Sequence, residues 1–258
     1  EWVSGTKAGR NYAYAWKFAT LALVGTNTPI TVVSLPVKFV SLPVKSASNL
    51  DSVVDRLLRL ATAKFDIDWV YLDSEFYQGG VVTKVRSEAD FIIKGKKGSD
   101  KLQEVKEEFI EEGKEWDDFR WGVGDVEDGR DYMFVLPEEK KSRLQKEDFD
   151  DPTDALTQFY TNRDPREFAT DERNGAEVLA EKFRGRWGVE TSYRVIKNRF
   201  LPQSGSPQIE HRMFLFGYAV LLYNMWTVAN AIGADRDDDH DLGKHGKYWK
   251  AVVFLSNM

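Results

Sequence analysis

The stretch that decides the fold is residues 67–94, IDWVYLDSEFYQGGVVTKVRSEADFIIK. Residues 67–72 are apolar and rich in β-branched and aromatic side chains, which predicts a short strand ending at Asp73. Residues 75–85 predict a short helix, and residues 90–94 predict a second strand. A helix that joins two strands in this way is the crossover of a parallel pair. The stretch therefore predicts an α/β fold.

The residues before this stretch extend the same unit. Residues 11–24 and 30–37 predict the two strands of a hairpin, joined by a turn at residues 25–29, GTNTP. Residues 49–65 carry apolar side chains at spacings of three and four, which predicts an amphipathic helix. The predicted order up to residue 94 is thus β-β-α-β-α-β.

The middle of the chain has a different composition. Residues 96–167 are dense in charge and contain short strand-like pieces at 119–123 and 131–136, punctuated by Gly and Pro. We interpret them as an inserted, partly β subdomain, so that residues 1–95 and 168–258 form the core.

Helices return in the last third of the sequence, at residues 176–200 and 213–232. The second of these is apolar and close to the ~20 residues that span a bilayer. However, Asn224 and Asn230 lie inside it and Arg212 stands at its start, which favours a buried core helix over a membrane span.

Composition excludes several classes of site. The chain of 258 residues is 42% apolar, which is enough to bury a large core, and it contains no cysteine, which excludes disulfides, thiolate metal sites and a Cys nucleophile. Its three His all follow Lys197, which argues against a His-based triad or a multi-His zinc site. A metal site would therefore be built from carboxylates, which suit hard ions such as Mg²⁺.

The net charge of −6 conceals an uneven distribution. Residues 101–151 hold 18 acidic and nine basic side chains, and we interpret this segment as a solvated face. Residues 182–212 hold seven basic side chains and two acidic ones. Because basic groups gathered on one surface can bind nucleic acid, the acidic chain as a whole does not exclude a nucleic-acid partner.

Asp73 is the first candidate for chemistry, because it stands where a hydrophobic strand ends. In open α/β sheets, ligand sites gather beyond the carboxyl ends of the strands, so a carboxylate there can bind a metal ion. The alternative is an ordinary loop Asp that caps the next helix.

The segment FRGRWGVETSYRVIK, residues 183–197, is the second candidate. At about 100° per residue, one face of a helix would carry an aromatic ring, a guanidinium, a carboxylate and an ammonium: Phe183, Arg186, Glu190 and Lys197. A carboxylate among cations suits a phosphodiester site, since the carboxylate can hold a metal and the cations can hold the DNA backbone. The alternative is a surface helix with an i,i+4 salt bridge, but Gly185 and Gly188 argue against a helix built only for stability.

At these residues the sequence resembles the insertion-sequence DDE transposases. The spacing of Phe183, Arg186, Glu190 and Lys197 matches the Tyr-(2)-Arg-(3)-Glu-(6)-Lys signature of that family, with Phe in the place of Tyr. The stretches RGRWGVETSYRVIKNRF and VYLDSEFY are similar to its archaeal branch, and the resemblance covers most of residues 10–232.

The resemblance implies an RNase H-like mixed sheet flanked by helices, with a β-containing insertion between the second catalytic Asp and the Glu. Asp73 would be that Asp and Glu190 that Glu, and both would bind metal, with two Mg²⁺ (or Mn²⁺) ions in a complete site. The implied DNA-binding side chains are Phe183, Arg186, Trp187, Tyr193, Arg194 and Lys197. Three Trp side chains are alternatives for stacking on an unpaired base: Trp116, Trp121 and Trp187.

The sequence departs from the family at the first catalytic Asp, which the family carries on a strand before the predicted hairpin. Glu1 is the only acidic residue among the first fifty. Either the first strand and its Asp lie upstream of Glu1, which the absence of an initial Met favours, or the chain is a decayed copy. In both cases we expect the chain to be inactive, or nearly so, by itself.

Three functions follow as hypotheses. The leading one is a DNA transposase that cleaves transposon ends in a metal-dependent reaction and then transfers the strand. Its partners would be double-stranded DNA (terminal inverted repeats and target DNA) and a second copy in a synaptic homodimer, in the cytoplasm on the nucleoid and with no membrane contact. The alternatives are another RNase H-like nuclease and a non-catalytic DNA-binding remnant or regulator.

Overall fold

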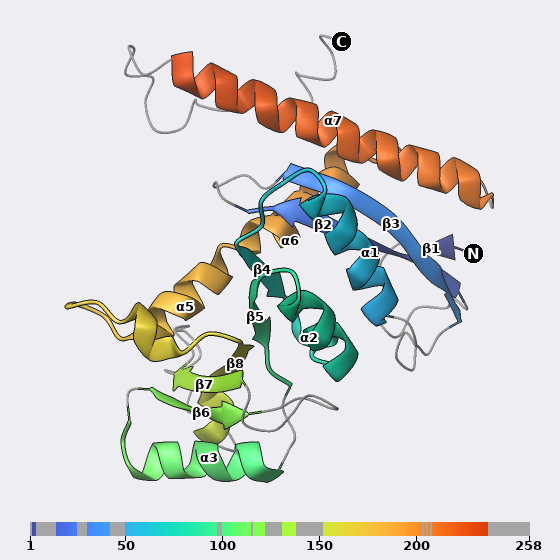
Figure 1. The fold of residues 1–258 in the computed structure, drawn as a ribbon. Helices are drawn as coiled ribbons and strands as arrows, with labels where there is room; N and C mark the ends of the chain where they lie inside the picture. Colours follow the sequence, from blue (N-terminus) through green and yellow to red (C-terminus); the bar gives the residue numbers. More distant parts are fainter. Residues whose placement is uncertain are drawn as a thin grey trace. The chain divides into compact units, whose positions relative to one another are not determined.

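The chain forms two compact units in the computed structural model (Figure 1). The central unit comprises Ser48–Arg184, and the terminal unit comprises Glu1–Ala47 and Gly185–Met258. The structure describes residues 2–3, 14–24, 30–41, 50–96, 100–114, 116–121, 131–137, 152–202, 204, 206 and 208–236. The predicted turn at residues 25–29 lies outside these ranges.

The central unit contains a mixed five-stranded sheet with the order β4-β5-β8-β7-β6. Its strands are β4 (Trp69–Leu72), β5 (Asp90–Lys94), β6 (Asp117–Trp121), β7 (Asp131–Pro137) and β8 (Leu156–Thr161). Its helices are α1 (Leu50–Thr62), η1 (Ser74–Phe76), α2 (Gly79–Arg86), α3 (Asp100–Glu111), η2 (Pro152–Ala155), η3 (Pro165–Phe168) and α5 (Gly175–Arg184). Strands β4 and β5 are parallel, with Trp69 opposite Asp90, and the other pairs are antiparallel. The predicted parallel pair is therefore confirmed.

Helices cover both faces of this sheet (Figure 1). On one face, α5 buries Leu179 and Phe183 against side chains of β5, β7 and β8, including Ile92 and Phe159. The opposite face carries Tyr160, whose ring lies 5.7 Å from those of both Phe91 and Tyr77. Strand β5 is covered on both sides, which explains why its sequence, DFIIK, shows no polar alternation.

The helix predicted at residues 75–85 is divided in the structure. Asp73 caps the short 3₁₀ helix η1, and α2 begins only at Gly79. Helix α2 packs on α1 so closely that a Cβ at Gly80 would lie 3.2 Å from the Cβ of Asp51. Both glycines therefore lie in the first turn of α2, and Gly80 lets the two helices approach.

Residues 96–167, which we interpreted from their composition as an inserted, partly β subdomain, supply three of the sheet's five strands. Strand β8 pairs directly with β5, placing Tyr160 opposite Ile93. The sheet therefore continues through the predicted boundary at residue 95, because long-range pairing joins segments of very different composition. Helix α3 carries part of this charge, while β7 is buried over six consecutive residues.

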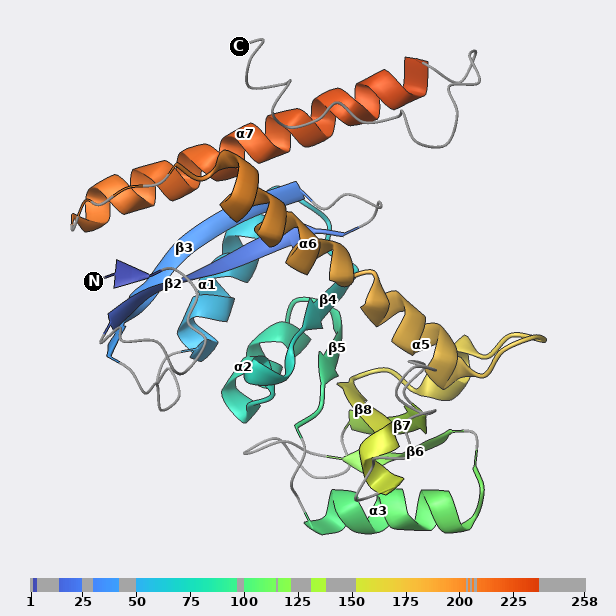
Figure 2. The same cartoon turned by 180° about the vertical axis from the view of Figure 1, so that it is seen from behind.

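The terminal unit contains a second sheet, with the order β1-β2-β3. Its elements are β1 (Trp2–Val3), β2 (Tyr14–Leu23), β3 (Ile30–Ser41), α6 (Trp187–Val195), the π-helical turn η4 (Ile196–Phe200) and α7 (Ile209–Arg236). Strands β2 and β3 form the predicted antiparallel hairpin. Figure 2 shows α7 passing along β3.

Asn224 attaches α7 to this hairpin. Its Nδ2 donates to the carbonyl oxygen of Thr31 at 2.7 Å, and its Oδ1 accepts from the Thr31 N–H at 3.1 Å. A second contact joins α7 to η4, where Phe200 packs against the rings of Tyr223 and Trp226. Among the described residues, no helix is both long enough and apolar enough to cross a bilayer.

Candidate functional site

Asp73 lies at the carboxyl end of β4, next to the parallel strand β5. Its side chain is half-buried, and its Oδ1 accepts a hydrogen bond from the N–H of Ser74 at 2.7 Å. Asp73 is also the N-cap of η1. The capping role considered as an alternative is thus present, and it orients the carboxylate at the end of the sheet where ligand sites form.

Glu190 lies in the first turn of α6, in the terminal unit. Its Oε1 lies 3.0 Å from Nη2 of Arg186, one helical turn earlier. The exposed fractions of the two side chains differ: 59% for Glu190 and 16% for Arg186. The predicted i,i+4 salt bridge therefore exists, and it leaves most of the Glu190 carboxylate open to solvent beside a guanidinium.

The predicted stripe is not carried by one regular helix. Helix α5 ends at Arg184, Gly185 and Arg186 form a turn, and α6 begins at Trp187. Ideal helical spacing of 100° per residue therefore does not extend from Phe183 to Glu190. Gly185, one of the two glycines that argued against a purely structural helix, lies in the turn at which the helix breaks.

Phe183 is one of the side chains that the family resemblance implies for DNA binding, but the structure places it in the core. Its side chain is 4% exposed and belongs to the core of the central unit. Its ring centroid lies 5.0 Å from that of Phe159 on β8. A ring buried in this way is not available to DNA.

The remaining predicted residues follow along α6 and η4. Arg194 and Lys197 are exposed, as a phosphate-binding role requires. Tyr193 is partly buried and packs against the core of the terminal unit, and this burial raises the pKa of its hydroxyl. Lys197 lies in the π-helical turn, a type of distortion that is frequent at functional sites.

The Trp alternatives have different outcomes. Trp116 packs against the core of the central unit, which disfavours it for base stacking. The side chains of Trp121 and Trp187 lie outside the described part of the structure.

Comparison with known proteins identifies the family. The family model described as "Transposase DDE domain" matches residues 44–204, a range that includes both Asp73 and Glu190. The chain belongs to this family. No curated protein matches the chain.

A solved structure has a similar fold to this transposase domain. It is described as "Cryo-EM structure of piggyBac transposase synaptic complex with hairpin DNA (SNHP)", and it is 8% identical in sequence with a TM-score of 0.56. The similarity covers 97% of this chain and 46% of the other, so the chain spans less than half the length of that transposase chain. At this identity the likeness shows the fold, a mixed α/β architecture of sheet and helices.

The oxygen donors of Asp73 and Glu190 are of the type that hard divalent cations prefer, so the transposase domain's acidic side chains fit such an ion in chemistry. Within the described ranges, however, no three Asp, Glu or His side chains lie close enough to hold a metal ion together. Asp73 belongs to the central unit and Glu190 to the terminal unit.

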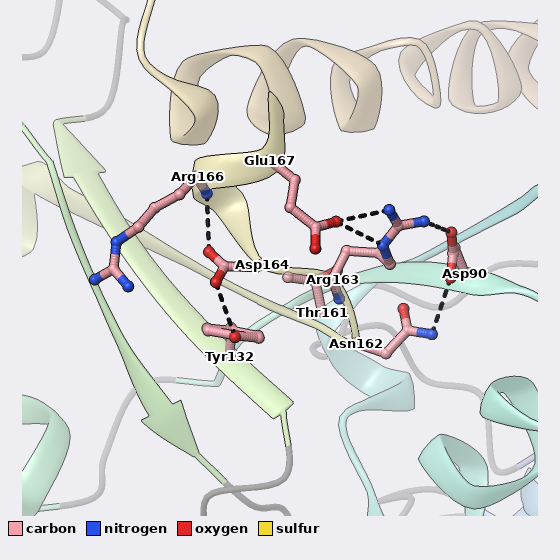
Figure 3. A network of polar contacts seen from close by, with 8 residues as sticks. All are labelled: Asp90, Tyr132, Thr161, Asn162, Arg163, Asp164, Arg166 and Glu167. Atoms are coloured by element: carbon pink, nitrogen blue, oxygen red, sulfur yellow. Dashed lines mark hydrogen bonds and ion pairs between the residues drawn. The ribbon is translucent and has the colours of Figure 1, made fainter. Parts of the chain in front are cut away.

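A polar network that no sequence motif predicted lies at the other end of the central sheet (Figure 3). The Arg163 guanidinium donates hydrogen bonds to two carboxylates, Glu167 at 2.7 Å and Asp90 at 2.7 Å. These bonds raise the pKa of the guanidinium, and the bond to Glu167 has the larger effect. Asn162 also donates to Asp90, at 3.1 Å. Asp90 begins β5, whereas Asp73 follows the end of the parallel strand β4, so this network supports the sheet end opposite to Asp73.

Proposed function

We propose that the chain carries the catalytic domain of a cut-and-paste DNA transposase, which cleaves DNA at transposon ends with a divalent metal and then transfers the freed strand. One observation carries this proposal: the transposase family match spans Asp73, which stands at the carboxyl end of a strand in a parallel pair, and Glu190 in its Arg-(3)-Glu-(6)-Lys context. We also propose that the core is RNase H-like and that the chain belongs to the archaeal branch of the insertion-sequence transposases.

Asp73 and Glu190 are the proposed ligands of Mg²⁺ or Mn²⁺. When bound, such ions activate the attacking oxygen and stabilise the leaving oxygen of a phosphodiester. The chain's own residues prepare the site: the Ser74 N–H fixes the direction of the Asp73 carboxylate, and Arg186 restrains Glu190. Both contacts reduce the conformational freedom of the carboxylates before the ion arrives.

DNA binding is assigned to the exposed basic side chains of the α6–η4 segment. Arg194 and Lys197 are exposed and lie within two turns of Glu190, so they can contact phosphates on either side of a scissile bond. The solved structure with a similar fold is a transposase synaptic complex with hairpin DNA. By analogy, we propose double-stranded transposon ends and target DNA as the partners, held by a homodimer.

The third carboxylate is proposed to come from a strand upstream of Glu1. The first fifty residues contain one acidic side chain, Glu1, and no Asp. A strand-terminal Asp from an upstream strand would complete three ligands with Asp73 and Glu190. This chain by itself would then be inactive or nearly so.

The second candidate function is a non-catalytic DNA-binding remnant or regulator. The observation that favours it is the same lack of an Asp in the first fifty residues, together with the ion pair that already neutralises part of the Glu190 charge. A different RNase H-like nuclease is also compatible with the fold, since fold alone does not define chemistry.

The test measures Mn²⁺ and Mg²⁺ binding by calorimetry for the chain and for Asp73→Asn and Glu190→Gln. The chain offers matched controls. Glu181 has a similar exposed fraction of 58% and is paired with Arg173, and Asp164 caps η3 as Asp73 caps η1. We expect weak binding that is lost in both test variants and kept in Glu181→Gln and Asp164→Asn.

The same substitutions are then made in the protein extended upstream to the next strand-terminal Asp, and nicking of duplex DNA is measured. Loss of nicking with retained DNA binding in Glu190→Gln supports the transposase. Retained nicking removes Glu190 from the site. If the extended protein neither binds metal nor nicks DNA, the DNA-binding remnant is the correct account.

A further inference from the structure

The turn that follows Asp73 is built by local hydrogen bonds. The Ser74 N–H donates to Oδ1 of Asp73 at 2.7 Å, and the Phe76 N–H donates to the Asp73 carbonyl oxygen at 2.9 Å. The N–H of Tyr77, the C-cap of η1, donates to the carbonyl oxygen of Ser74 at 3.2 Å. These bonds join neighbours in sequence, so they shape the turn without fixing it to the sheet.

The ring of Tyr77 attaches this turn to the centre of the sheet. It lies edge-on to the ring of Tyr160 in β8, with centroids 5.7 Å apart and an interplanar angle of 87°. Tyr160 is fully buried and also packs on Phe91 of β5, at 5.7 Å. Edge-to-face pairs of this kind are a favoured aromatic geometry. The end of the turn is therefore held against a ring that the core itself immobilises.

The hydroxyl of Tyr160 connects this contact to the other end of α2. It donates to Asp131 of β7, which is 2% exposed, and Asp131 pairs with Arg86, the last residue of α2. Helix α2 has eight residues, a length of about 12 Å, and it begins two residues after Tyr77. The segment from Tyr77 to Arg86 is thus attached at both ends to two hydrogen-bonded side chains, Tyr160 and Asp131.

Apolar packing already holds α2 on the sheet without these polar groups. Three side chains of the helix, Val81, Val82 and Val85, are fully buried, as is Ile93, which lies opposite Tyr160 in the sheet. Burial of apolar area is non-directional, so it stabilises the helix without specifying its exact position. A buried ion pair seldom stabilises more than apolar side chains of the same volume would, and its best-attested use is to specify one arrangement.

We propose that Arg86, Asp131 and Tyr160 are positioning residues for Asp73. They hold α2 and the preceding turn in one place, so that the Asp73 carboxylate keeps one orientation beyond the carboxyl end of β4. This inference rests on the proposed function for the role of Asp73 as a metal ligand. The alternative is that the three side chains only add stability. That alternative predicts an unchanged native turn in every variant that folds, whereas the positioning role predicts a turn that opens more often.

Two variants loosen the two ends of the segment separately. Arg86→Met combined with Asp131→Asn frees the end of α2, and it removes both charges together so that no unpaired charge stays buried. Tyr77→Ala frees the turn at the start of the segment, and because Tyr77 is only half-buried this variant keeps the core intact.

Two matched controls remove similar contacts elsewhere in the central unit. Arg163→Met combined with Asp90→Asn removes another Arg–Asp pair of the same sheet, with a separation of 2.7 Å. Phe168→Ala removes another half-buried ring, which lies edge-on to Trp69 with centroids 5.6 Å apart.

The first measurement is amide hydrogen exchange of the full chain without metal. The Ser74 N–H reports the orientation of Asp73, because it is bonded to that carboxylate, and the N–H of the fully buried Leu179 in α5 reports global unfolding. We expect exchange at Ser74 to be roughly 5- to 10-fold faster in each test variant, as when one anchoring contact is lost, and unchanged in the controls. If the test variants accelerate exchange at Leu179 and leave Ser74 as in wild type, the side chains only add stability and the proposal is overturned.

The second measurement is Mn²⁺ affinity by calorimetry. Where wild type binds Mn²⁺ and Asp73→Asn abolishes binding, we expect Kd to rise roughly 5- to 10-fold in both test variants and to stay unchanged in the controls. An unchanged Kd in the test variants overturns the positioning role and leaves the metal site in place. If neither this chain nor the protein extended upstream binds Mn²⁺, the metal site fails instead, and exchange at Ser74 alone decides whether these residues position the turn.

Discussion

A buried ionic contact in the central unit gives a quantitative prediction about its stability. Asp131, on β7, is 2% exposed and accepts a hydrogen bond from the hydroxyl of the fully buried Tyr160. The same carboxylate pairs with Arg86 at the end of α2, whose side chain is 15% exposed. Asp131 thus joins the helix that follows Asp73 to two strands of the sheet.

Asp131→Asn removes the charge and keeps the shape. The Tyr160 hydrogen bond then goes to a neutral acceptor, which costs about 1 kcal/mol. The guanidinium of Arg86 loses its buried counter-charge, and breaking a buried pair from one side costs about 3–5 kcal/mol. Because Arg86 retains some access to water, we expect a total of about 3–5 kcal/mol, which corresponds to a fall in Tm of about 6–20 °C.

The assay is urea unfolding followed by circular dichroism, with Asp55→Asn as the control. Asp55 is 27% exposed and pairs with Arg59, which is 72% exposed, so its loss should cost less than about 1 kcal/mol. Asp131→Asn combined with Arg86→Met should recover part of the loss, since the unpaired charge is then gone. If Asp131→Asn costs no more than Asp55→Asn, the buried contact does not stabilise the sheet as argued.

Three further predictions concern the signature segment. Phe183→Ala should destabilise the chain by about 3–5 kcal/mol, because it leaves a cavity in the core next to Phe159. Thermal unfolding would measure this loss. Burial raises the pKa of Tyr193 in the folded chain, so the contribution of this side chain to stability is complete below about pH 10 and is lost as the pH rises through the folded pKa. Above pH 10 the free energy of unfolding of the wild-type chain should therefore fall, relative to that of Tyr193→Phe, by up to ~1.4 kcal/mol per pH unit. Lys197→Ala should weaken duplex DNA binding and lower the slope of log K against log salt by about 1, measured by fluorescence anisotropy.

Each of these has a result that contradicts it. A loss below 1 kcal/mol in Phe183→Ala, similar to that of the 38% exposed Phe65→Ala, would remove Phe183 from the core. Parallel stability profiles of wild type and Tyr193→Phe from pH 9 to 11 would contradict the raised pKa. An unchanged salt slope in Lys197→Ala, equal to that of the exposed Lys64→Ala, would return Lys197 to an ordinary surface position.

The sequence by itself determined the local elements and the family. Apolar periodicity placed β4, α1 and β5 within a few residues of their observed bounds, because each element buries one or both faces and therefore repeats its apolar residues at a fixed interval. The spacing of Arg186, Glu190 and Lys197, with a strand-terminal Asp73, identified a DDE transposase, and the family match agrees.

The tertiary structure decided which segments share a sheet and which side chains are buried. Residues 96–167 differ from their neighbours in charge, and the pairing of β8 with β5 was not predicted, because strand pairing depends on hydrogen bonds between distant backbones that composition does not encode. Phe183 matched a functional signature, yet it lies in the core, because α5 ends at Arg184 and packs its apolar side chains on the central sheet. Likewise, the apolar residues of α7 predicted only burial, and the structure was needed to show that they pack against η4 and that the helix contacts β3.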